Sequence, residues 1–325
     1  MKIAHLAAYE NLNAGDSALQ YGLRRVLSED WPEALEFTSM HVTKGQQYLD
    51  AINRHDLCLI GGGGLISPDR TPSGIMIPFD VEQLRAITIP IIVYGIGHNL
   101  FAGDTVDISC VEKLRDIATA FSVRNDGSVK RLAMDVDVVP DPGMWIEAND
   151  TKESYDVVIQ LAANRTSGRM GNEAKFLGSI RRLLRQLKEQ YSVLAVSHIQ
   201  KDDRYAVYCK RWGTATRPAD HRRKLQNIRA FFGVYKNAKC VIAMRGHAQI
   251  CAYGLDTPFY TIATQAKNTG FAEDVGYDDY IARAGEFDIE KIHQLVRGNG
   301  PEHRLDEYRE RARTYHKRLW GLLNA

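Results

Sequence analysis

Three residues late in the chain, Arg245-Gly246-His247, combine a cation with an imidazole. They follow the apolar run Val241 to Ala243 and precede an apolar, helix-like stretch from Ala248 to Tyr253. This order predicts a strand that delivers both side chains to the start of a helix. Ligands of open α/β sheets bind beyond the carboxyl ends of the strands, and a helix N-terminus favours anions. The motif therefore indicates a site for a phosphorylated or carboxylated substrate, with a surface or helix-capping role as the alternative.

A second arginine has a similar position, because the strand-like run Val157 to Ala162 leads to Asn164-Arg165. Two guanidinium groups offer paired donors that match carboxylate or phosphate geometry. His247 would then lie beside the anion with a side chain able to transfer a proton near neutral pH. The sequence thus predicts acid–base chemistry on a small dianion. It has no Ser nucleophile elbow, H-E-x-x-H or Asp-x-Asp cluster, so we expect no catalytic metal.

Glycines and polar residues also follow predicted strands in the first half of the chain. Gly61 to Gly64 come directly after Leu57 to Ile60, and such a run lets backbone amides approach a ligand, with a tight, ligand-free loop as the alternative. Pro68 and Pro72 interrupt any helix there and no Lys-Ser or Lys-Thr follows, which argues against ATP or nicotinamide binding.

Further polar residues at predicted strand ends are Asn11, Asn13, Gly15 and Asp16, then Gly95 to Asn99 with His98, then Arg124, Asn125 and Asp126. Their repeated position predicts a ligand crevice at one edge of the first sheet. For single residues the alternatives are helix capping by Asp16 and Asp126 and a backbone-satisfying role for His98.

An α/β fold would position these residues, because short apolar runs alternate with helical patterns along the chain. The first half predicts strands at Ile3 to Ala8, Leu57 to Ile60, Ile89 to Tyr94 and Ala120 to Val123, and helices at Asp16 to Leu27 and Val111 to Ala118. Pro140 to Glu153 is polar and turn-forming, which indicates an inter-domain linker.

After this linker the pattern restarts. The second half predicts strands at Tyr155 to Ala162, Ser192 to Ser197 and Pro258 to Ile262, which closes the core, and helices at Asn172 to Gln190 and from about Arg223 to Asn237. We therefore predict two Rossmann-like domains that face a cleft, over residues 1–148 and 154–300.

The last segment, 301–325, is predicted to form a basic amphipathic helix that packs back across both domains. Its apolar positions are Leu305, Tyr308, Ala312, Tyr315, Leu319 and Leu322. Peripheral membrane contact is the alternative, which Trp320 favours.

Composition narrows the class of protein. The chain has 325 residues and is 44% hydrophobic. Its formal net charge is only +2, so the overall balance of basic and acidic residues does not suggest a nucleic-acid partner. Its five cysteines are scattered without a C-x-x-C pair, which is typical of reduced cysteines in a cytosolic protein. The N-terminal run is interrupted by His5 and lacks the apolar core of a signal peptide. We expect a cytoplasmic protein, with a peripheral position on the inner face of the membrane as the alternative.

Together these motifs resemble those of the polysaccharide pyruvyl transferase family. The resemblance extends in order over nearly the whole chain, through Asn13-x-Gly15-Asp16, Ile60 to Gly64, Gly95-x-Gly97, Ser122 to Asn125, Asp141-Pro142-Gly143, Arg245-Gly246-His247, Lys267-Asn268-x-Gly270-Phe271 and Asp274-x-Gly276. It implies a GT-B-like fold and a transferase that uses phosphoenolpyruvate as donor, with no cofactor. The acceptor would be a sugar or lipid-linked oligosaccharide with two hydroxyls, and the products a cyclic pyruvate ketal and phosphate.

The resemblance also implies roles for individual residues. Family members commonly have Arg-Leu-His where this chain has Arg245-Gly246-His247, so Gly246 is a departure that alters the pocket. The expected catalytic residues are His247, as the acid, and Arg245. The expected donor-binding residues are Asn164, Arg165, Arg245, Lys267 and Asn268, with Arg165 matched by strand position alone. The expected acceptor-binding residues are Asn13, Asp16, Gly62, Gly63, His98 and Arg124.

Two other functions stay open. One is a GT-B glycosyltransferase that uses a nucleotide sugar, in which Glu273 or Asp274 would bind ribose hydroxyls. The other is a non-catalytic carbohydrate-binding relative, which Gly246 favours and the retained Arg245 and His247 oppose. The acceptor sugar, its linkage, the ketal stereochemistry and the oligomeric state are left open by the resemblance.

Overall fold

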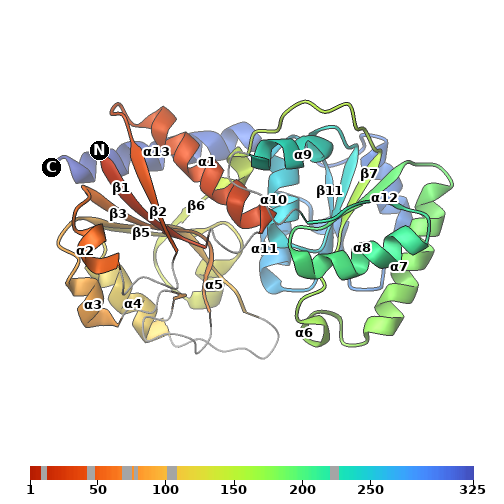
Figure 1. Ribbon diagram of the computed structural model, residues 1–325, viewed down its shortest axis with the longest axis horizontal. Coiled ribbons are helices and arrows are strands. Elements are labelled where there is room, and N and C mark those ends of the chain that lie inside the picture. Colours follow the sequence, from red (N-terminus) through yellow and green to blue (C-terminus); the bar gives the residue numbers. More distant parts are fainter. Residues whose placement is uncertain (9–12, 42–47, 68–74, 77–79, 101–107, 220–226) are drawn as a thin grey trace. The chain divides into compact units, whose positions relative to one another are not determined.

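The computed structural model describes residues 1–8, 13–41, 48–67, 75–76, 80–100, 108–219 and 227–325. The chain divides into two compact units. Unit 1 comprises residues 1–11, 19–142 and 306–325, and unit 2 comprises residues 12–18 and 143–305. Each unit is a parallel sheet flanked by helices (Figure 1).

Unit 1 contains a six-stranded parallel sheet in the order β2-β1-β3-β4-β5-β6. Its strands are β1 (Lys2–Ala7), β2 (Glu36–His41), β3 (Leu57–Ile66), β4 (Ile91–His98), β5 (Ala120–Arg124) and β6 (Asp137–Val139). Its helices are α1 (Ala14–Asp30), whose first residues belong to unit 2, α2 (Leu49–Ile52), α3 (Val81–Arg85), α4 (Ile108–Ile117), α5 (Ser128–Leu132) and α13 (Leu305–Leu323).

Unit 2 contains a second six-stranded parallel sheet in the order β12-β11-β10-β7-β8-β9. Its strands are β7 (Val157–Gln160), β8 (Val193–Val196), β9 (Ala215–Arg217), β10 (Cys240–Ala243), β11 (Phe259–Ala263) and β12 (Ile281–Arg283). Its helices are α6 (Thr166–Met170), α7 (Glu173–Lys188), α8 (Asp203–Arg211), α9 (Ile228–Lys236), α10 (Gly246–Gly254), α11 (Ala266–Asp274) and α12 (Ile289–Val296).

The predicted α/β alternation is confirmed in both halves of the chain. The predicted apolar runs form the central strands of both sheets. A central strand of a parallel sheet is covered by helices on both faces, so its side chains are apolar on both sides. The edge strands β2, β6, β9 and β12 were not predicted, since most of them are short or partly polar. The prediction that Pro258 to Ile262 closes the core is wrong, because β12 pairs with β11 beyond it. The start predicted for α9 falls in 220–226, outside the described residues.

The glycine run was predicted as a loop, and this is wrong: β3 continues through Gly61 to Gly64 as far as Ile66. Gly61 (φ +135°) lies against the backbone of β4, where a β-carbon would overlap the Tyr94 carbonyl. Gly62 (φ +67°) lies against α1, where a β-carbon would overlap the side chain of Leu19. The glycines therefore allow close packing inside unit 1. The predicted loop at Gly95 to Asn99 is likewise mostly strand, because β4 extends to His98.

The apolar face of α13 is buried inside unit 1. Trp320 packs on Trp31, which directly follows α1, with ring centroids 5.5 Å apart, and Tyr315 packs on Tyr94. The buried ring of His316 bonds to the Tyr94 hydroxyl (2.7 Å) and to an Asp30 carboxylate oxygen (2.5 Å). The predicted amphipathic helix thus exists, and its apolar stripe is covered by its own protein.

Before this helix, the segment at His303 and Arg304 belongs to unit 2 and packs on Tyr253. His303 stacks on Tyr253, and the backbone N–H of Arg304 donates to the Tyr253 hydroxyl. None of the helices in the described ranges has the length and apolarity needed to span a lipid bilayer.

We expect Gly61→Ala to lower the free energy of unfolding by about 3 kcal/mol or more, because the new methyl group overlaps a neighbouring strand and the backbone angle is unfavourable. Gly171→Ala is the matched control, since Gly171 also has a positive φ (+63°) but no other atom lies within 4 Å of its β-carbon position. It should lose only about 1 kcal/mol. Urea denaturation measures both, and equal losses would contradict a packing role for Gly61.

Candidate active site

The site lies at the carboxyl edge of the sheet in unit 2. Strands β7 and β10 are neighbours there, yet the chain runs outward from β7 to β8 and β9 before it returns to β10 on the other side. This reversal makes the β7/β10 edge the topological switch point, where open α/β sheets bind ligands. Asn164 and Arg165 follow β7, and Arg245 and His247 follow β10. The sequence prediction that these two strand ends lie together is confirmed.

Arg245 is fixed by a buried carboxylate that the sequence did not reveal. Its Nε and one terminal nitrogen donate to the two oxygens of Asp202, at 2.7 and 2.6 Å. The same terminal nitrogen donates to Oδ1 of Asn164 (2.8 Å), and the Arg245 backbone N–H donates to Oε1 of Gln160. Asp202 is fully buried, whereas the Arg245 side chain keeps 11% exposure. Asp202 therefore orients the guanidinium while leaving part of it accessible.

Arg169 of α6 is a third arginine at this edge. Its guanidinium donates to the Asn164 carbonyl (3.0 Å) and to the Thr264 hydroxyl (2.8 Å) beyond β11. Burial, together with the like charges of Arg245 and Arg165, lowers the pKa of Arg169 to about 9, and Asp202 only partly opposes this. Burial is the largest cause of this lowered pKa, and an anion bound beside the three arginines would favour the charged form of Arg169.

Arg169 and Asp202 could not be selected from the sequence, because neither directly follows the apolar core of a strand. Arg165 itself has a left-handed backbone (φ +53°), which is uncommon for a residue other than glycine and often marks a functional turn.

His247 lies in the first turn of α10 and contacts the start of α1. Its Nδ1 is 3.4 Å from Oδ1 of Asp16. Gly15 leaves room for the ring, because a β-carbon there would lie 2.6 Å from Nδ1 of His247. Asn13 organises this turn: its side-chain N–H donates to Asp16 (2.9 Å), and its side-chain oxygen accepts from the Gly15 N–H (3.0 Å).

The same turn is tied to unit 2 through its backbone, since the Ala14 N–H donates to the His198 carbonyl after β8. Asn13 and Asp16, predicted to bind the acceptor, thus lie around the predicted catalytic histidine. Asn11, predicted in the same loop, falls outside the described residues.

Two predicted donor-binding residues follow β11. Asn268 is fully buried. Its side-chain N–H donates to the Met244 backbone carbonyl, and its backbone carbonyl accepts from the side chain of Gln249. This placement favours a supporting role for Asn268 rather than direct contact with a ligand. Lys267 lies closer to the motif, because its Cε is 4.0 Å from the position that a β-carbon of Gly246 would take.

The predicted acceptor residues of unit 1 are buried. Arg124 donates to Asp126 (2.6 Å) and Asp141 (2.8 Å) and is 2% exposed. Burial disfavours its charged form, but the two carboxylates raise the pKa of Arg124 above its usual value. His98 is fully buried, with Nδ1 2.8 Å from the Ser128 hydroxyl. These contacts favour a structural role for Arg124 and His98.

Gly62 and Gly63 are buried within β3. None of the four residues in unit 1 therefore presents an accessible polar side chain. Their acceptor-binding role stays a prediction.

Solved structures of similar fold include three UDP-N-acetylglucosamine 2-epimerases. The putative enzyme from Listeria monocytogenes has a TM-score of 0.57 at 10% identity, over 96% of this chain and 90% of that one. The enzyme from Methanocaldococcus jannaschii has a TM-score of 0.56 at 12% identity over the whole of both chains. The Neisseria meningitidis structure, bound to UDP-GlcNAc, has a TM-score of 0.53 at 10% identity over 99% of each chain. Such identities show the fold alone, and they confirm the predicted GT-B-like class.

The chain belongs to the polysaccharide pyruvyl transferase family, whose model matches residues 13–265. The matched range begins at Asn13 and includes the Arg245-Gly246-His247 segment, so the resemblance drawn from these motifs is confirmed. Membership assigns the chain to a family of transferases of polysaccharide biosynthesis. No curated protein sequence matches the chain significantly.

We expect inorganic phosphate, added at constant ionic strength, to raise the unfolding temperature of the protein, because it binds the folded state alone. Arg169→Gln should weaken this phosphate binding about 10- to 100-fold, as expected for the loss of one charge-assisted hydrogen bond. Arg182→Gln is the control, since that arginine bonds to Ser179 within α7. An identical phosphate dependence in Arg169→Gln and the unaltered protein would contradict an anion site at Arg169.

Proposed function

We propose that this protein transfers the pyruvate group of phosphoenolpyruvate onto two hydroxyls of a sugar, forming a cyclic ketal and releasing phosphate. One observation carries the proposal: at the carboxyl edge of the unit 2 sheet, Arg169 is buried close enough to Arg245 and Arg165 for burial and their charges to lower its pKa, and Asp202, which bonds to Arg245, opposes this only in part. A donor with both a carboxylate and a phosphate would offset this excess positive charge. Membership of the pyruvyl transferase family supports the same donor.

The donor's anionic groups would take the remaining capacity of these cations. Arg245 is held in one orientation by Asp202, so little side-chain freedom is lost when a ligand binds. Lys267 lies against the same turn and adds a positive charge where phosphate would leave. The N-terminal N–H groups of α10 favour an anion at this place as well.

His247 is the proposed acid. It protonates the methylene carbon of the enol phosphate, which gives the neighbouring carbon oxocarbenium character. One sugar hydroxyl attacks that carbon, phosphate departs with the former bridging oxygen, and the second hydroxyl closes the ketal. The two hydroxyls release two protons: one replaces the proton that His247 gave to the new methyl group, and the other leaves with phosphate. The arginines stabilise the departing phosphate.

Asp16 is the proposed positioning residue for this acid. A carboxylate at Nδ1 orients the imidazole and holds the Nδ1 proton, so that Nε2 is the nitrogen that faces the substrate. Asn13 in turn fixes the Asp16 carboxylate. The proposal assigns the Asn13-x-Gly15-Asp16 motif to the histidine, in place of the acceptor-binding role predicted for Asn13 and Asp16 from the sequence. Gly62 and Gly63 remain proposed for the acceptor side through backbone contacts.

Phosphate release should depend on both phosphoenolpyruvate and a sugar diol when the protein is tested against a panel of galactosides, mannosamine derivatives and lipid-linked saccharides. His247→Ala should lower kcat by about 10² to 10⁴, the range for loss of a general acid, while phosphoenolpyruvate still raises its unfolding temperature. Unchanged turnover in a folded His247→Ala protein would rule out the acid role. Stabilisation by a nucleotide sugar but not by phosphoenolpyruvate would favour a glycosyltransferase instead.

Gly15→Ala should lower kcat about 100-fold, because the added methyl group displaces the His247 ring and a shift of about 1 Å at a catalytic group has that effect. Gly178→Ala is the matched control. Its β-carbon position meets only Arg182, at 3.9 Å, and it lies inside α7, where alanine favours the helix. The control should keep full activity. Full activity in Gly15→Ala would show that the motif does not position the histidine.

A further inference from the structure

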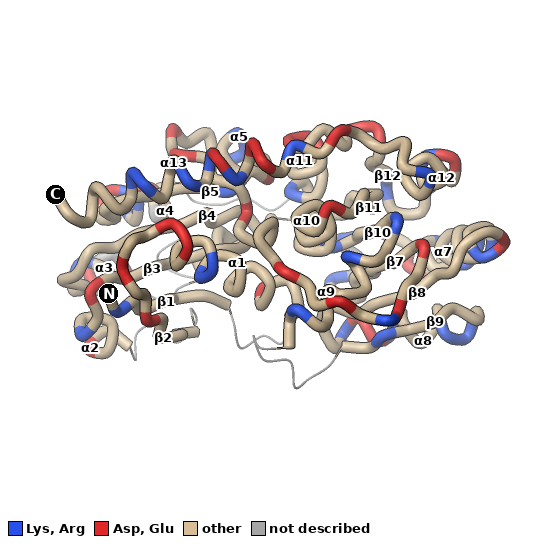
Figure 2. The backbone as a smooth tube through the Cα atoms, turned by 90° about the horizontal axis from the view of Figure 1, so that it is seen from above, with Lys and Arg blue, Asp and Glu red and all other residues tan. Residues whose placement is uncertain are grey.

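The outer face of α7 and α8 in unit 2 carries most of the chain's excess positive charge. From Glu173, where α7 begins, to Arg211, where α8 ends, there are nine basic and four acidic residues, of which Asp202 is buried and Glu173 pairs with Arg204. The whole chain has only two more basic than acidic residues, so the rest of it is net negative. Figure 2 shows the basic positions in blue along both helices. The positive charge is therefore concentrated on one surface.

We call this surface the basic face and define it by Arg181, Arg185, Lys188, Arg211 and Trp212. These residues line one hollow of about 600 Å³, together with Gly178, Arg182 and Leu184. The arginines Arg181, Arg185 and Arg211 are exposed and form no ion pair with a carboxylate in the part of the chain that the structure describes. Their charges are thus available to an external anion.

Aromatic and apolar groups accompany the charges. Trp212 stacks on Tyr208, with ring centroids 5.9 Å apart and planes 24° apart, and its carbonyl accepts from Nζ of Lys188. Val207, on the same outer side of α8, is 51% exposed and is one of only two large hydrophobic side chains so exposed among the described residues. Tryptophan, tyrosine and aliphatic side chains beside arginine and lysine are typical of surfaces at the lipid headgroup level.

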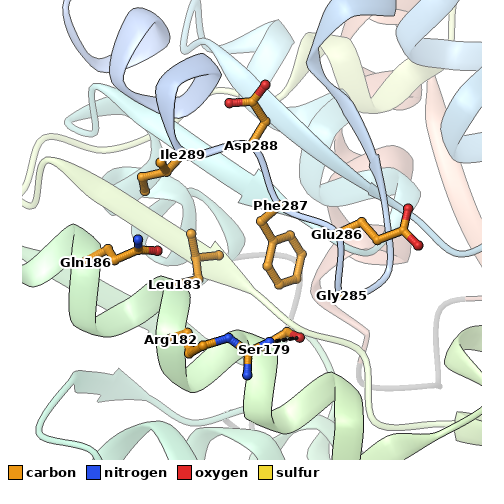
Figure 3. Close-up of a pocket in the computed structure, with 9 residues that line it drawn as sticks. All are labelled: Ser179, Arg182, Leu183, Gln186, Gly285, Glu286, Phe287, Asp288 and Ile289. Atoms are coloured by element: carbon orange, nitrogen blue, oxygen red, sulfur yellow. Dashed lines mark hydrogen bonds between the residues drawn. The ribbon is translucent and has the colours of Figure 1, made fainter.

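The opposite side of α7 marks a boundary of the basic face. A second hollow, of about 610 Å³, lies between α7 and the segment Gly285 to Ile289 (Figure 3). Glu286 and Asp288 contribute carboxylates to that segment, and the Arg182 guanidinium donates a hydrogen bond to the Ser179 hydroxyl. An anionic surface would be repelled there. The binding surface is therefore limited to the side with Arg181 and Arg185.

Helix α13 is the other basic amphipathic element, but its apolar face is already used. Trp320, Tyr315 and Leu319 pack inside unit 1, so the exposed large hydrophobic side chain that α13 retains among the described residues is Leu322, at 49% exposure. The basic face of unit 2 combines its charges with Val207 and with the stacked rings of Trp212 and Tyr208.

We infer that the basic face docks this protein on an anionic phospholipid membrane. The phosphate groups of lipid headgroups would neutralise Arg181, Arg185, Lys188 and Arg211, while Trp212 and Val207 enter the headgroup region. Clusters of four to eight basic residues on a helical face bind anionic lipid in this way, and the attraction is screened by salt. The inference stands on unit 2 alone and does not depend on the proposed reaction.

Cosedimentation with vesicles tests this docking. The full-length protein should bind vesicles that contain 30% phosphatidylglycerol, bind pure phosphatidylcholine much less, and dissociate as salt is raised. The variant Arg181→Gln, Arg185→Gln, Arg211→Gln should bind about 100-fold more weakly, as expected for the loss of three surface charges near anionic lipid. Its phosphate-dependent stabilisation should be unchanged, because Arg169 and Arg245 are untouched.

The matched control removes the same charge from α13, through Arg309→Gln, Arg313→Gln and Lys317→Gln, all at exposed positions. It should bind vesicles as the unaltered protein does. Stronger loss in this control than in the α7–α8 variant would place docking on α13 and overturn the inference. Absence of binding by the unaltered protein would do the same, as would binding to duplex DNA in preference to the vesicles.

Discussion

The site depends on one buried carboxylate. Asp202 accepts two hydrogen bonds from Arg245 and further ones from the backbone N–H of Ala163 and the side chain of Gln160. Without it, the Arg245 guanidinium would lose the carboxylate to which it bonds while the like charges of Arg165 and Arg169 stayed nearby, at a cost of several kcal/mol. With it, Arg245 is held in one orientation at the carboxyl edge of the sheet. The geometry of the candidate site therefore rests on Asp202.

The second constraint is the placement of one helical turn. Helix α1 belongs mostly to unit 1, yet its first turn, with Gly15 and Asp16, is grouped with unit 2 by its contacts. A histidine on α10 thereby receives its carboxylate from a segment more than 200 residues earlier in the chain. The short spacing of Asn13, Gly15 and Asp16 follows from this contact. Asn13 bonds to the Asp16 carboxylate, Gly15 leaves space for the His247 ring, and Asp16 contacts that ring.

The sequence was sufficient to predict the central strands and to place Arg165 and Arg245 after neighbouring strands. Apolar runs form the buried strands of a parallel sheet, and the carboxyl ends of those strands lie along one edge of the sheet. It could not find Arg169, whose importance comes from burial beside other cations and leaves no trace in spacing. It also did not show that β3 continues through Gly61 to Gly64, since a glycine run looks the same in a loop and in a tightly packed strand. The close approach of the Tyr94 carbonyl and the Leu19 side chain explains why glycine is needed at Gly61 and Gly62. The burial of Arg124 was not foreseen for a related reason, because one of its two carboxylate partners, Asp141, is distant in sequence and the other, Asp126, lies in a turn.

Gly246 shows how a departure from the family's usual motif can be accommodated. Its backbone does not need glycine, since it lies in the first turn of a regular helix and its β-carbon position is 4.0 Å from the nearest atom. That atom is Cε of Lys267, at an ordinary contact distance for a β-carbon, so alanine would fit at position 246 and a longer side chain would extend beyond that contact. Glycine leaves the space beside Lys267 open. The departure from the family's apolar residue and the proximity of Lys267 therefore concern the same corner of the candidate site.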